Sequence, residues 1–178
     1  MILKNYWKWL DAINKFNFWT RYEGDKNIGL VAIDGENLPI SFNCTADDTN
    51  FRQIADRVSQ NYNLVNNITI RVGASEHEVT SDSYTLENDI TNNISGFSYN
   101  VISSADNGVS RIITMQGVNS GDEAITIKQV AICKKMWYIP SGYNYSQKEV
   151  MLAICILDEP IVVQPHNNFK FIFEWLEQ

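Results

Sequence analysis

The stretch FKFIFEWLE at residues 169–177 decides the fold, because aromatic side chains recur at every second position. Four aromatic residues share one face of the extended chain and two charged residues share the other: Phe169, Phe171, Phe173 and Trp175 against Lys170 and Glu174. This two-residue period is typical of a half-buried strand. We expect the aromatic face in the core, since leaving it frayed would expose a large apolar surface.

Further strand patterns precede this one along the chain. The two longest read DEAITIKQVAICKK at 122–135 and VMLAICILDEPIVV at 150–163, and Asp158-Glu159-Pro160 is expected to form a turn. Shorter patterns lie at 28–33, 38–42, 68–73, 97–104 and 109–117, with hairpin turns expected at Asp34-Gly35 and at 105–108. About eight short strands joined by turns predict a mainly β fold, an antiparallel two-sheet β-sandwich.

An amphipathic helix is expected near the start of the chain, over residues 2–19. Its apolar positions follow helical spacing: Ile2, Leu3, Tyr6, Trp7, Leu10, Ile13 and Phe16. Trp9, Phe18 and Trp19 add apolar bulk outside this face. The segment either caps the open end of the sandwich or docks in a groove on a partner. We therefore divide the chain into an N-terminal helix and candidate anchor, 1–20, and a β-sandwich domain, 21–178. A second, shorter helix is expected at 49–60.

Composition limits the classes of function. The 178 residues are 44% hydrophobic and 20% charged, which is typical of a globular domain. A net charge of −7 disfavours binding to nucleic acid or to an anionic membrane surface. No apolar run is long enough to cross a bilayer, and the N-terminal sequence lacks the features of a signal peptide. The chain is accordingly expected to be made and kept in a cytoplasm.

No catalytic or metal-binding motif emerges from the sequence. The two histidines, His77 and His166, lie in polar or turn segments, and three adjacent residues such as 76–78 cannot all face one ion. Phosphate-cradling glycine loops and nucleophile elbows are not recognisable. Cys133 and Cys155 lie within apolar strands, where buried free thiols are expected, and Cys44 leaves the cysteine count odd. We expect a protein that is not an enzyme and needs no cofactor or metal.

An aromatic segment supplies a candidate contact surface. Residues 136–149, MWYIPSGYNYSQKE, are expected to form a long loop between strands, and exposed loops rich in Tyr and Trp are commonly contact surfaces. The expected partner-binding residues come from this loop and from the helix: Trp137, Tyr138, Tyr143 and Tyr145, together with Trp7, Trp9, Phe16 and Trp19.

Residues 68–90, ITIRVGASEHEVTSDSYTLENDI, combine a strand, a glycine turn and a polar run that ends in apolar residues. The positions that carry this pattern are Val72, Gly73, Asp82, Tyr84 and Leu86. The segment resembles a recurrent element of tailed-bacteriophage virion proteins. In those proteins a strand leads through a glycine-rich turn into a Pro/Thr-x-x-Asp-Tyr-x-Leu run.

Two later segments, 125–135 and 151–175, are similar to the closing part of the same proteins. There an Ile-Thr-Ile-x-Glu-Val-Gly strand precedes a Leu-Asp-x-Pro-Ile-x-Val turn and a final Phe-x-Phe-x-Phe strand. The opening MILKNYWKWLDA is similar to small structural proteins of phages that infect gut bacteria, including the crAss-like group. The chain departs from the pattern at Gln129, at Ala131 and at 75–77, where acidic and glycine residues are more usual.

The resemblance implies a phage virion protein of the neck, tail or capsid surface, assembled in the bacterial host cytoplasm and present in multiple copies. Its partners would be other virion proteins and further copies of the same chain in a homo-oligomer. An acidic β-sandwich without catalytic motifs suits such an assembly subunit. The alternative is a carbohydrate- or host-receptor-binding module, because exposed Trp and Tyr rings also stack on the sugar rings of a glycan.

Overall fold

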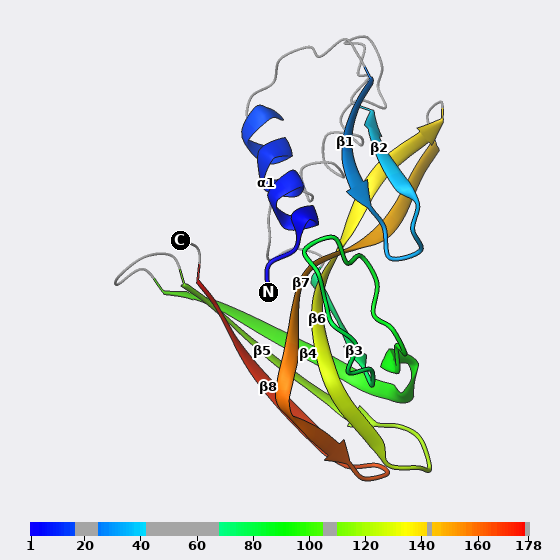
Figure 1. The fold of residues 1–178 in the computed structure, drawn as a ribbon, viewed down its shortest axis with the longest axis vertical. Helices are drawn as coiled ribbons and strands as arrows, with labels where there is room; N and C mark the ends of the chain where they lie inside the picture. Colours follow the sequence, from blue (N-terminus) through cyan, green and yellow to red (C-terminus); the bar gives the residue numbers. More distant parts are fainter. Residues whose placement is uncertain (17–24, 42–67, 105–109, 142–143, 177–178) are drawn as a thin grey trace. The chain divides into compact units, whose positions relative to one another are not determined.

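The structure is a computed structural model that describes residues 1–16, 25–41, 68–104, 110–141 and 144–176. Its described part is mainly β, with one α-helix near the N-terminus (Figure 1). The elements follow in this order: α1 (Lys4–Phe16), β1 (Asp25–Val31), β2 (Asn37–Ser41), β3 (Ile68–Gly73), the 3₁₀ turn η1 (Thr91–Asn93), β4 (Ile94–Ser104), β5 (Ser110–Asn119), β6 (Ile125–Ser141), β7 (Asn144–Val163) and β8 (Asn168–Leu176). The predicted mainly β fold with an N-terminal helix is confirmed.

The described strands form three sheets, with the orders β1-β2, β3-β6-β7 and β4-β5-β8. The chain divides into two compact units, each assembled from separate segments. Unit 1 comprises residues 1–69, 77–86 and 131–155, and unit 2 comprises residues 70–76, 87–130 and 156–178. The long strands β6 and β7 contribute residues to both units.

In unit 1, β1 and β2 form the hairpin that the Asp34-Gly35 pair predicts. The strands pair antiparallel from Asp25 opposite Ser41 to Val31 opposite Asn37. Gly35 has a φ of 85°, a conformation that residues with a Cβ rarely adopt, and its N–H donates to the carbonyl of Ala32 at 2.9 Å. The turn therefore closes because glycine stands where the backbone needs a positive φ.

The core of unit 1 draws together distant parts of the chain. One cluster of buried side chains contains Leu3, Val79, Leu86, Ala131, Cys133, Met151 and Ile154, with Ile33 packed against it. Burying these apolar groups removes them from water, which is the main driving force for folding. The segment 77–86, although largely without regular structure, is therefore held in part by the burial of Val79 and Leu86. The N–H of Lys4 also donates to the carbonyl of Ser81 at 2.8 Å.

In unit 2, β5 lies between β4 and β8, and both pairs are antiparallel. Phe169 and Phe171 are buried, whereas Lys170 and Glu174 are exposed, so the alternation predicted for 169–177 is confirmed at these positions. The buried face continues onto β5 through Ile113 and Met115. β4 and β5 pair from Ile94 to Ser104, in agreement with the predicted hairpin, although residues 105–109 lie outside the described part.

Two expectations about turns and loops are wrong. Asp158-Glu159-Pro160 does not form a turn, because β7 runs without interruption from Asn144 to Val163. Proline is tolerated there because β7 is the last strand of its sheet, where a missing N–H need not pair. The predicted loop at 136–149 is instead mostly strand, since β6 extends to Ser141 and β7 begins at Asn144.

The expectation of buried cysteines is confirmed for Cys133 and wrong for Cys155. Cys133 is buried, but Cys155 is exposed. Residues 150–154 of β7 are all buried, and 155 and 156 are both exposed. Residues 150–157 are all apolar, so the sequence does not show that complete burial ends after Ile154. Cys44 and the predicted helix at 49–60 lie outside the described residues.

Candidate interaction site

The first three residues run beside β7 before α1 begins. Ile2 forms an antiparallel bridge with Ala153, and the N–H of Leu3 donates to the carbonyl of Leu152 at 2.9 Å. The nitrogen of Met1 donates to the carbonyl of Ile154 at 2.6 Å. The N-terminal segment is therefore tied to unit 1 by main-chain hydrogen bonds as well as by the burial of Leu3.

Helix α1 is fixed to its neighbours through Asn5. The side-chain amide of Asn5 donates to the carbonyls of Val31 at 2.9 Å and Met151 at 3.3 Å, and its oxygen accepts from the N–H of Val31 at 3.1 Å. Only 4% of Asn5 is exposed. A buried amide with its donors and acceptor paired specifies one orientation of the helix, because any rotation would leave polar groups unsatisfied.

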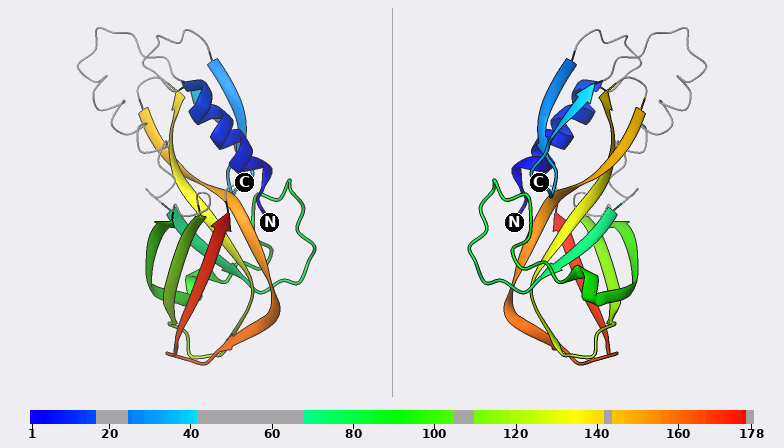
Figure 2. Two further views of the ribbon diagram at one scale, coloured as in Figure 1. Left: turned by 90° about the vertical axis from the view of Figure 1, so that its left-hand side faces the viewer. Right: turned by 90° about the vertical axis from the view of Figure 1, so that its right-hand side faces the viewer.

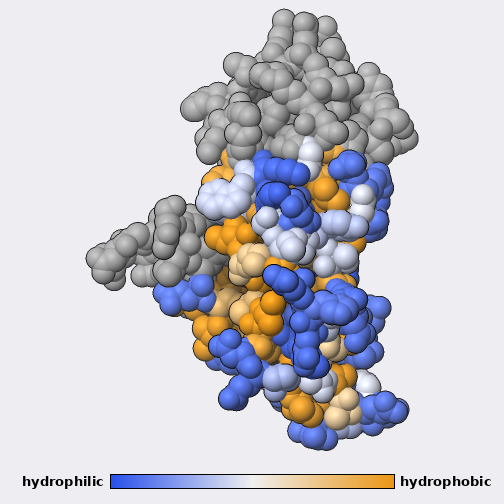
Figure 3. Space-filling model, viewed as in Figure 1, coloured by the Kyte–Doolittle hydropathy of each residue, from blue (hydrophilic) through white to orange (hydrophobic). Residues whose placement is uncertain are grey.

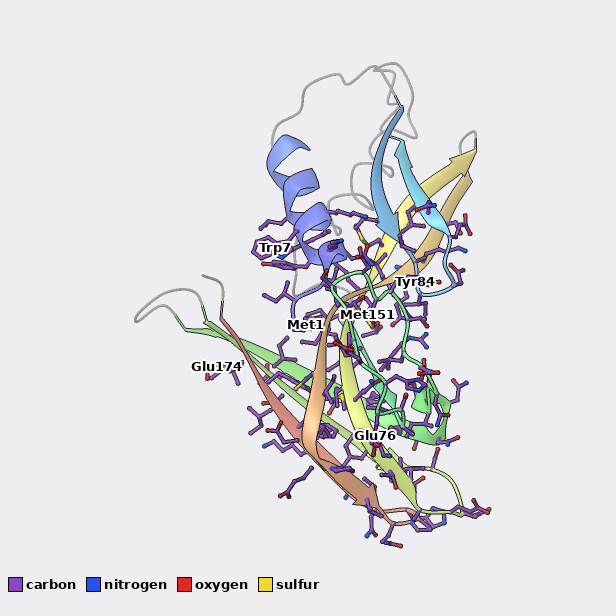
Figure 4. The ribbon with its side chains drawn as sticks, in the orientation of Figure 1. Met1, Trp7, Glu76, Tyr84, Met151 and Glu174 are labelled. Atoms are coloured by element: carbon purple, nitrogen blue, oxygen red, sulfur yellow. The ribbon has the colours of Figure 1, made fainter. Side chains whose placement is uncertain are left out.

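This orientation places the two tryptophans of α1 differently. Trp7 is 53% exposed and Trp9 is 4% exposed. The expectation that Trp7 belongs to the core-facing side and that Trp9 lies outside it is therefore wrong. Tyr6 lies between them, with ring centroids 5.3 Å from Trp7 and 5.7 Å from Trp9. Trp7, labelled in Figure 4, thus rests on Tyr6 and presents half of its surface outward.

The ring of Trp9 contacts a buried cation. The Nζ of Lys134 lies 5.9 Å from the ring centroid of Trp9, and Lys134 itself is fully buried. Burial lowers the pKa of Lys134 from its ordinary value of 10.5 to about 8, because an ammonium group loses its hydration there. The attraction between a cation and an aromatic face offsets part of this cost.

A second exposed aromatic side chain of unit 1 comes from the segment 77–86. Tyr84 is 39% exposed, and its ring lies against Gly35 of the β1–β2 turn (Figure 4). Sequence reasoning placed Tyr84 in the pattern shared with virion proteins but not among the contact residues. The signal that could have singled it out is its position in a polar run, where a large ring has few apolar neighbours.

Charged side chains surround the same turn. The ammonium group of Lys148 forms ion pairs with Asp34 and Glu36. The hydrogen bond from Lys148 lowers the pKa of Asp34, and the bonds to both carboxylates raise the pKa of Lys148. Both carboxylates are about half exposed to solvent, which screens the pairs, so each pair contributes little to stability.

Four of the other residues predicted to bind a partner belong to elements that the structure describes. Trp137 and Tyr138 belong to β6, Tyr145 belongs to β7, and Phe16 is the last residue of α1. Trp19 and Tyr143 lie outside the described residues.

Within the described ranges, no group of three or more His, Cys, Asp or Glu side chains is placed to hold a metal ion. The helix that the structure describes is not long and apolar enough to cross a membrane. His166 has an acidic neighbour, Asp122, with 3.7 Å between Nε2 and Oδ1, and both side chains are exposed. An exposed pair at this distance is weakly coupled.

Comparisons of the chain with protein-family models, with curated proteins and with solved structures find no match.

Proposed function

We propose that this chain is a structural subunit of a bacteriophage virion, present in several copies in the neck, tail or capsid surface. In this role it acts by packing against other virion proteins and against further copies of itself. It performs no catalysis and needs no cofactor.

The observation that carries the proposal is the composition of the core cluster of unit 1. Each segment that resembles virion proteins supplies part of it: Leu3 from the opening, Val79 and Leu86 from 68–90, Ala131 and Cys133 from 125–135, and Met151 and Ile154 from 151–175. Parts of all four segments therefore pack together in one cluster, as the parts of a shared fold would. This supports a common fold with such proteins.

A sandwich is the finer fold that we propose for unit 2. One layer is the sheet β4-β5-β8, and the parts of β3, β6 and β7 in unit 2 form the other. Both layers carry buried apolar residues at alternate positions: Ile113, Met115, Phe169 and Phe171 in the first, and Ile70, Val72, Ile125 and Ile127 in the second. Two sheets with apolar inner faces stabilise one another by stacking face to face.

Asn119 joins the two layers of this sandwich at one end. Its side-chain amide, at the end of β5, donates to the carbonyl of Val163, at the end of β7, with a distance of 3.0 Å. The same amide group donates to the carbonyl of Glu123 at 2.8 Å. Asn119 is fully buried and its bond to Val163 is shielded from water, which strengthens this connection.

Trp7 is the contact that we assign to the anchor. Its indole is half exposed on a helix that Asn5 holds in place, so little conformational entropy is lost when a partner covers it. Large aromatic side chains with this preorganisation often dominate the energy of an interface. Trp9 contributes to the anchor indirectly, through Tyr6 and the packing of the helix.

The proposal is tested by quantitative mass spectrometry of purified particles of the phage whose genome encodes the chain. Peptides of the chain are expected in particles that have been washed with high salt, at several copies per particle. If the chain is absent from such particles, the proposed function is wrong.

The anchor is tested in the same particles with the full-length chain. We expect Trp7→Ala to lower its incorporation at least several-fold, whereas Phe97→Ala, at a 37% exposed aromatic residue of unit 2, leaves it unchanged. Point substitution is preferable to deletion of residues 1–19, because deletion would also remove the buried Leu3 and Asn5. Equal incorporation of both variants would refute the role of Trp7.

A further inference from the structure

Strand β8 is an edge of its sheet in the part of the chain that the structure describes. In the order β4-β5-β8 it pairs on one side only, with β5, from Asn168 to Leu176. Figure 2 shows β8, in red, at one side of the two green strands. An edge strand presents a row of main-chain donors and acceptors to which another strand can add.

The outer face of β8 is exposed and carries a mixed set of side chains. Lys170, Ile172 and Glu174 alternate with the inward-facing phenylalanines, and Ile172 is 65% exposed, more than the other exposed large apolar residues of the described chain. Figure 4 shows Glu174 projecting away from the ribbon of β8. In Figure 3, hydrophobic and hydrophilic residues lie side by side on the visible face of unit 2.

The order of these residues is self-complementary when the strand meets itself antiparallel. If Ile172 lies opposite Ile172 of a second copy, Lys170 lies opposite Glu174 of that copy, and Glu174 opposite its Lys170. Residues directly opposite in an antiparallel pair have Cβ atoms about 4.5–5.5 Å apart, close enough for opposite charges to attract. The two-fold symmetry produces this pairing twice.

Other registers lose this complementarity. A two-fold axis through residue 170 or 174 sets lysine against lysine or glutamate against glutamate. An axis through residue 171 or 173 leaves the charges opposite uncharged residues, and parallel in-register pairing again joins like charges. Like charges directly opposite one another destabilise a strand pair. Only the axis through Ile172 satisfies both charges.

The buried face is compatible with the same register. Phe171 would lie opposite Phe173 of the second copy, and Phe173 is less buried than Phe171 within its own chain. The rings of Phe171 and Phe173 are already neighbours, with centroids 6.0 Å apart. Extending the sheet would therefore continue the aromatic row and cover the partly exposed Phe173, and it would bury Ile172 against its symmetry mate.

We propose that β8 is a self-association edge, at which a second copy of this chain adds antiparallel with the two-fold axis at Ile172. The two sheets then form one continuous sheet in the order β4-β5-β8-β8-β5-β4. This inference rests on the proposed function, because it identifies the contact between copies of a subunit that is present in several copies. The occupant is a second copy because the charges of β8 complement those of β8 itself.

Charge reversal tests the register, with the dissociation constant of the dimer measured by analytical ultracentrifugation of the full chain. Lys170→Glu and Glu174→Lys are each expected to raise it by about tenfold or more, because each variant places like charges opposite one another twice. The double variant K170E/E174K restores the dimer. An equimolar mixture of the two single variants forms heterodimers, since every facing pair then has opposite charges.

Cysteine cross-linking tests the position of the axis. In Ile172→Cys the two thiols would face one another at a separation that a disulfide can bridge, so oxidation yields a covalent dimer. Lys170→Cys, whose thiol would face Glu174, is the matched control and stays uncross-linked at that position. The wild-type chain, which keeps the same native cysteines, controls for their oxidation.

A monomeric wild-type chain, or charge reversal without rescue by the double variant, would overturn the β8 contact. These outcomes differ from failure of the proposed function. A chain that is abundant in particles but monomeric in solution retains the virion role and loses the β8 contact. A chain that dimerises through β8 but is absent from particles retains the β8 contact as a property of the chain and loses the virion role.

Discussion

Replacing Lys134 by methionine is expected to stabilise the protein. The side chain is fully buried and its charged form is desolvated, which lowers its pKa from 10.5 to about 8. A change of this size corresponds to about 3 kcal/mol, because each pKa unit is worth about 1.4 kcal/mol. The contact with Trp9 returns part of that cost, since a cation over an indole is worth about 0.5–2 kcal/mol. We therefore expect Lys134→Met to raise the free energy of unfolding by about 1–2 kcal/mol at pH 7.

The same lysine predicts how stability depends on pH. Below pH 8 both the folded and the unfolded chain carry the proton, and the folded state bears the full desolvation cost. Between pH 8 and 10.5 the unfolded chain binds more protons than the folded one, so the contribution of Lys134 makes stability rise with pH. In Lys134→Met this rise is absent, and the difference between the two proteins shrinks across that range.

Urea denaturation at pH 7, 8, 9 and 10 measures both effects. Lys135→Met is the matched control, because Lys135 is adjacent and exposed, and its removal should change stability by less than about 0.5 kcal/mol. The reasoning is refuted if Lys134→Met destabilises the protein at pH 7, or if its stability relative to wild type is the same at pH 7 and pH 10.

Three further substitutions test the packing of unit 2. Gly117→Ala should lower the free energy of unfolding by about 1–3 kcal/mol, measured by thermal or urea denaturation, because a Cβ would lie 2.9 Å from the ring of Phe169. Gly121→Ala is the control and should be nearly neutral, because the nearest contact of its Cβ would be at 3.4 Å. Asn119→Ala should cost about 2–4 kcal/mol, since it leaves one buried and one partly buried carbonyl without their donor; a loss below 1 kcal/mol would contradict this. Burial alone would raise the pKa of Asp89, but hydrogen bonds from Thr91 and the ion pair with Arg71 lower it overall. The wild-type chain should therefore lose stability as pH falls below about 4. The Asp89→Asn variant should lose less stability over the same range.

Elements with a strict local period could be predicted from sequence. The alternation in 169–177 and in ITIRVG at 68–73 depends only on which face each side chain occupies. Burial follows it from Phe169 to Glu174 and from Ile68 to Val72. The Asp34-Gly35 turn was equally predictable, because the positive φ required there favours glycine. In these cases the local preference and the tertiary environment agree.

Proline and glycine were misleading in the longest hairpin. Pro140 and Gly142 suggested a loop, and Pro160 suggested a turn, but strand structure reaches to Ser141 and continues across residue 160. Pro160 is tolerated because β7 is at the edge of its sheet among the described strands, where an N–H need not pair. This reason does not extend to Pro140, because β6 lies between β3 and β7. Whether a strand is an edge depends on sheet order, which the residues themselves do not encode locally.

The aromatic excess of the N-terminal segment could be seen in the sequence, but the exposure of each ring could not. The aromatic excess of the N-terminal segment indicated a helix with more apolar surface than one face requires. Helical spacing alone did not show which of Trp7 and Trp9 is buried. The answer depends on how the helix is rotated about its axis, and the hydrogen bonds of Asn5 fix that rotation. The burial of Lys134 was equally hidden, since its neighbour Lys135 made the segment look like a polar strand end.

A cryo-electron microscopy reconstruction of the particle at side-chain resolution tests the central claim most directly. It is expected to contain several copies of this chain, with Trp7 of each copy covered by a neighbouring protein. The account is contradicted if the fully interpreted particle contains no copy of the chain, or if every copy leaves Trp7 in contact with solvent alone.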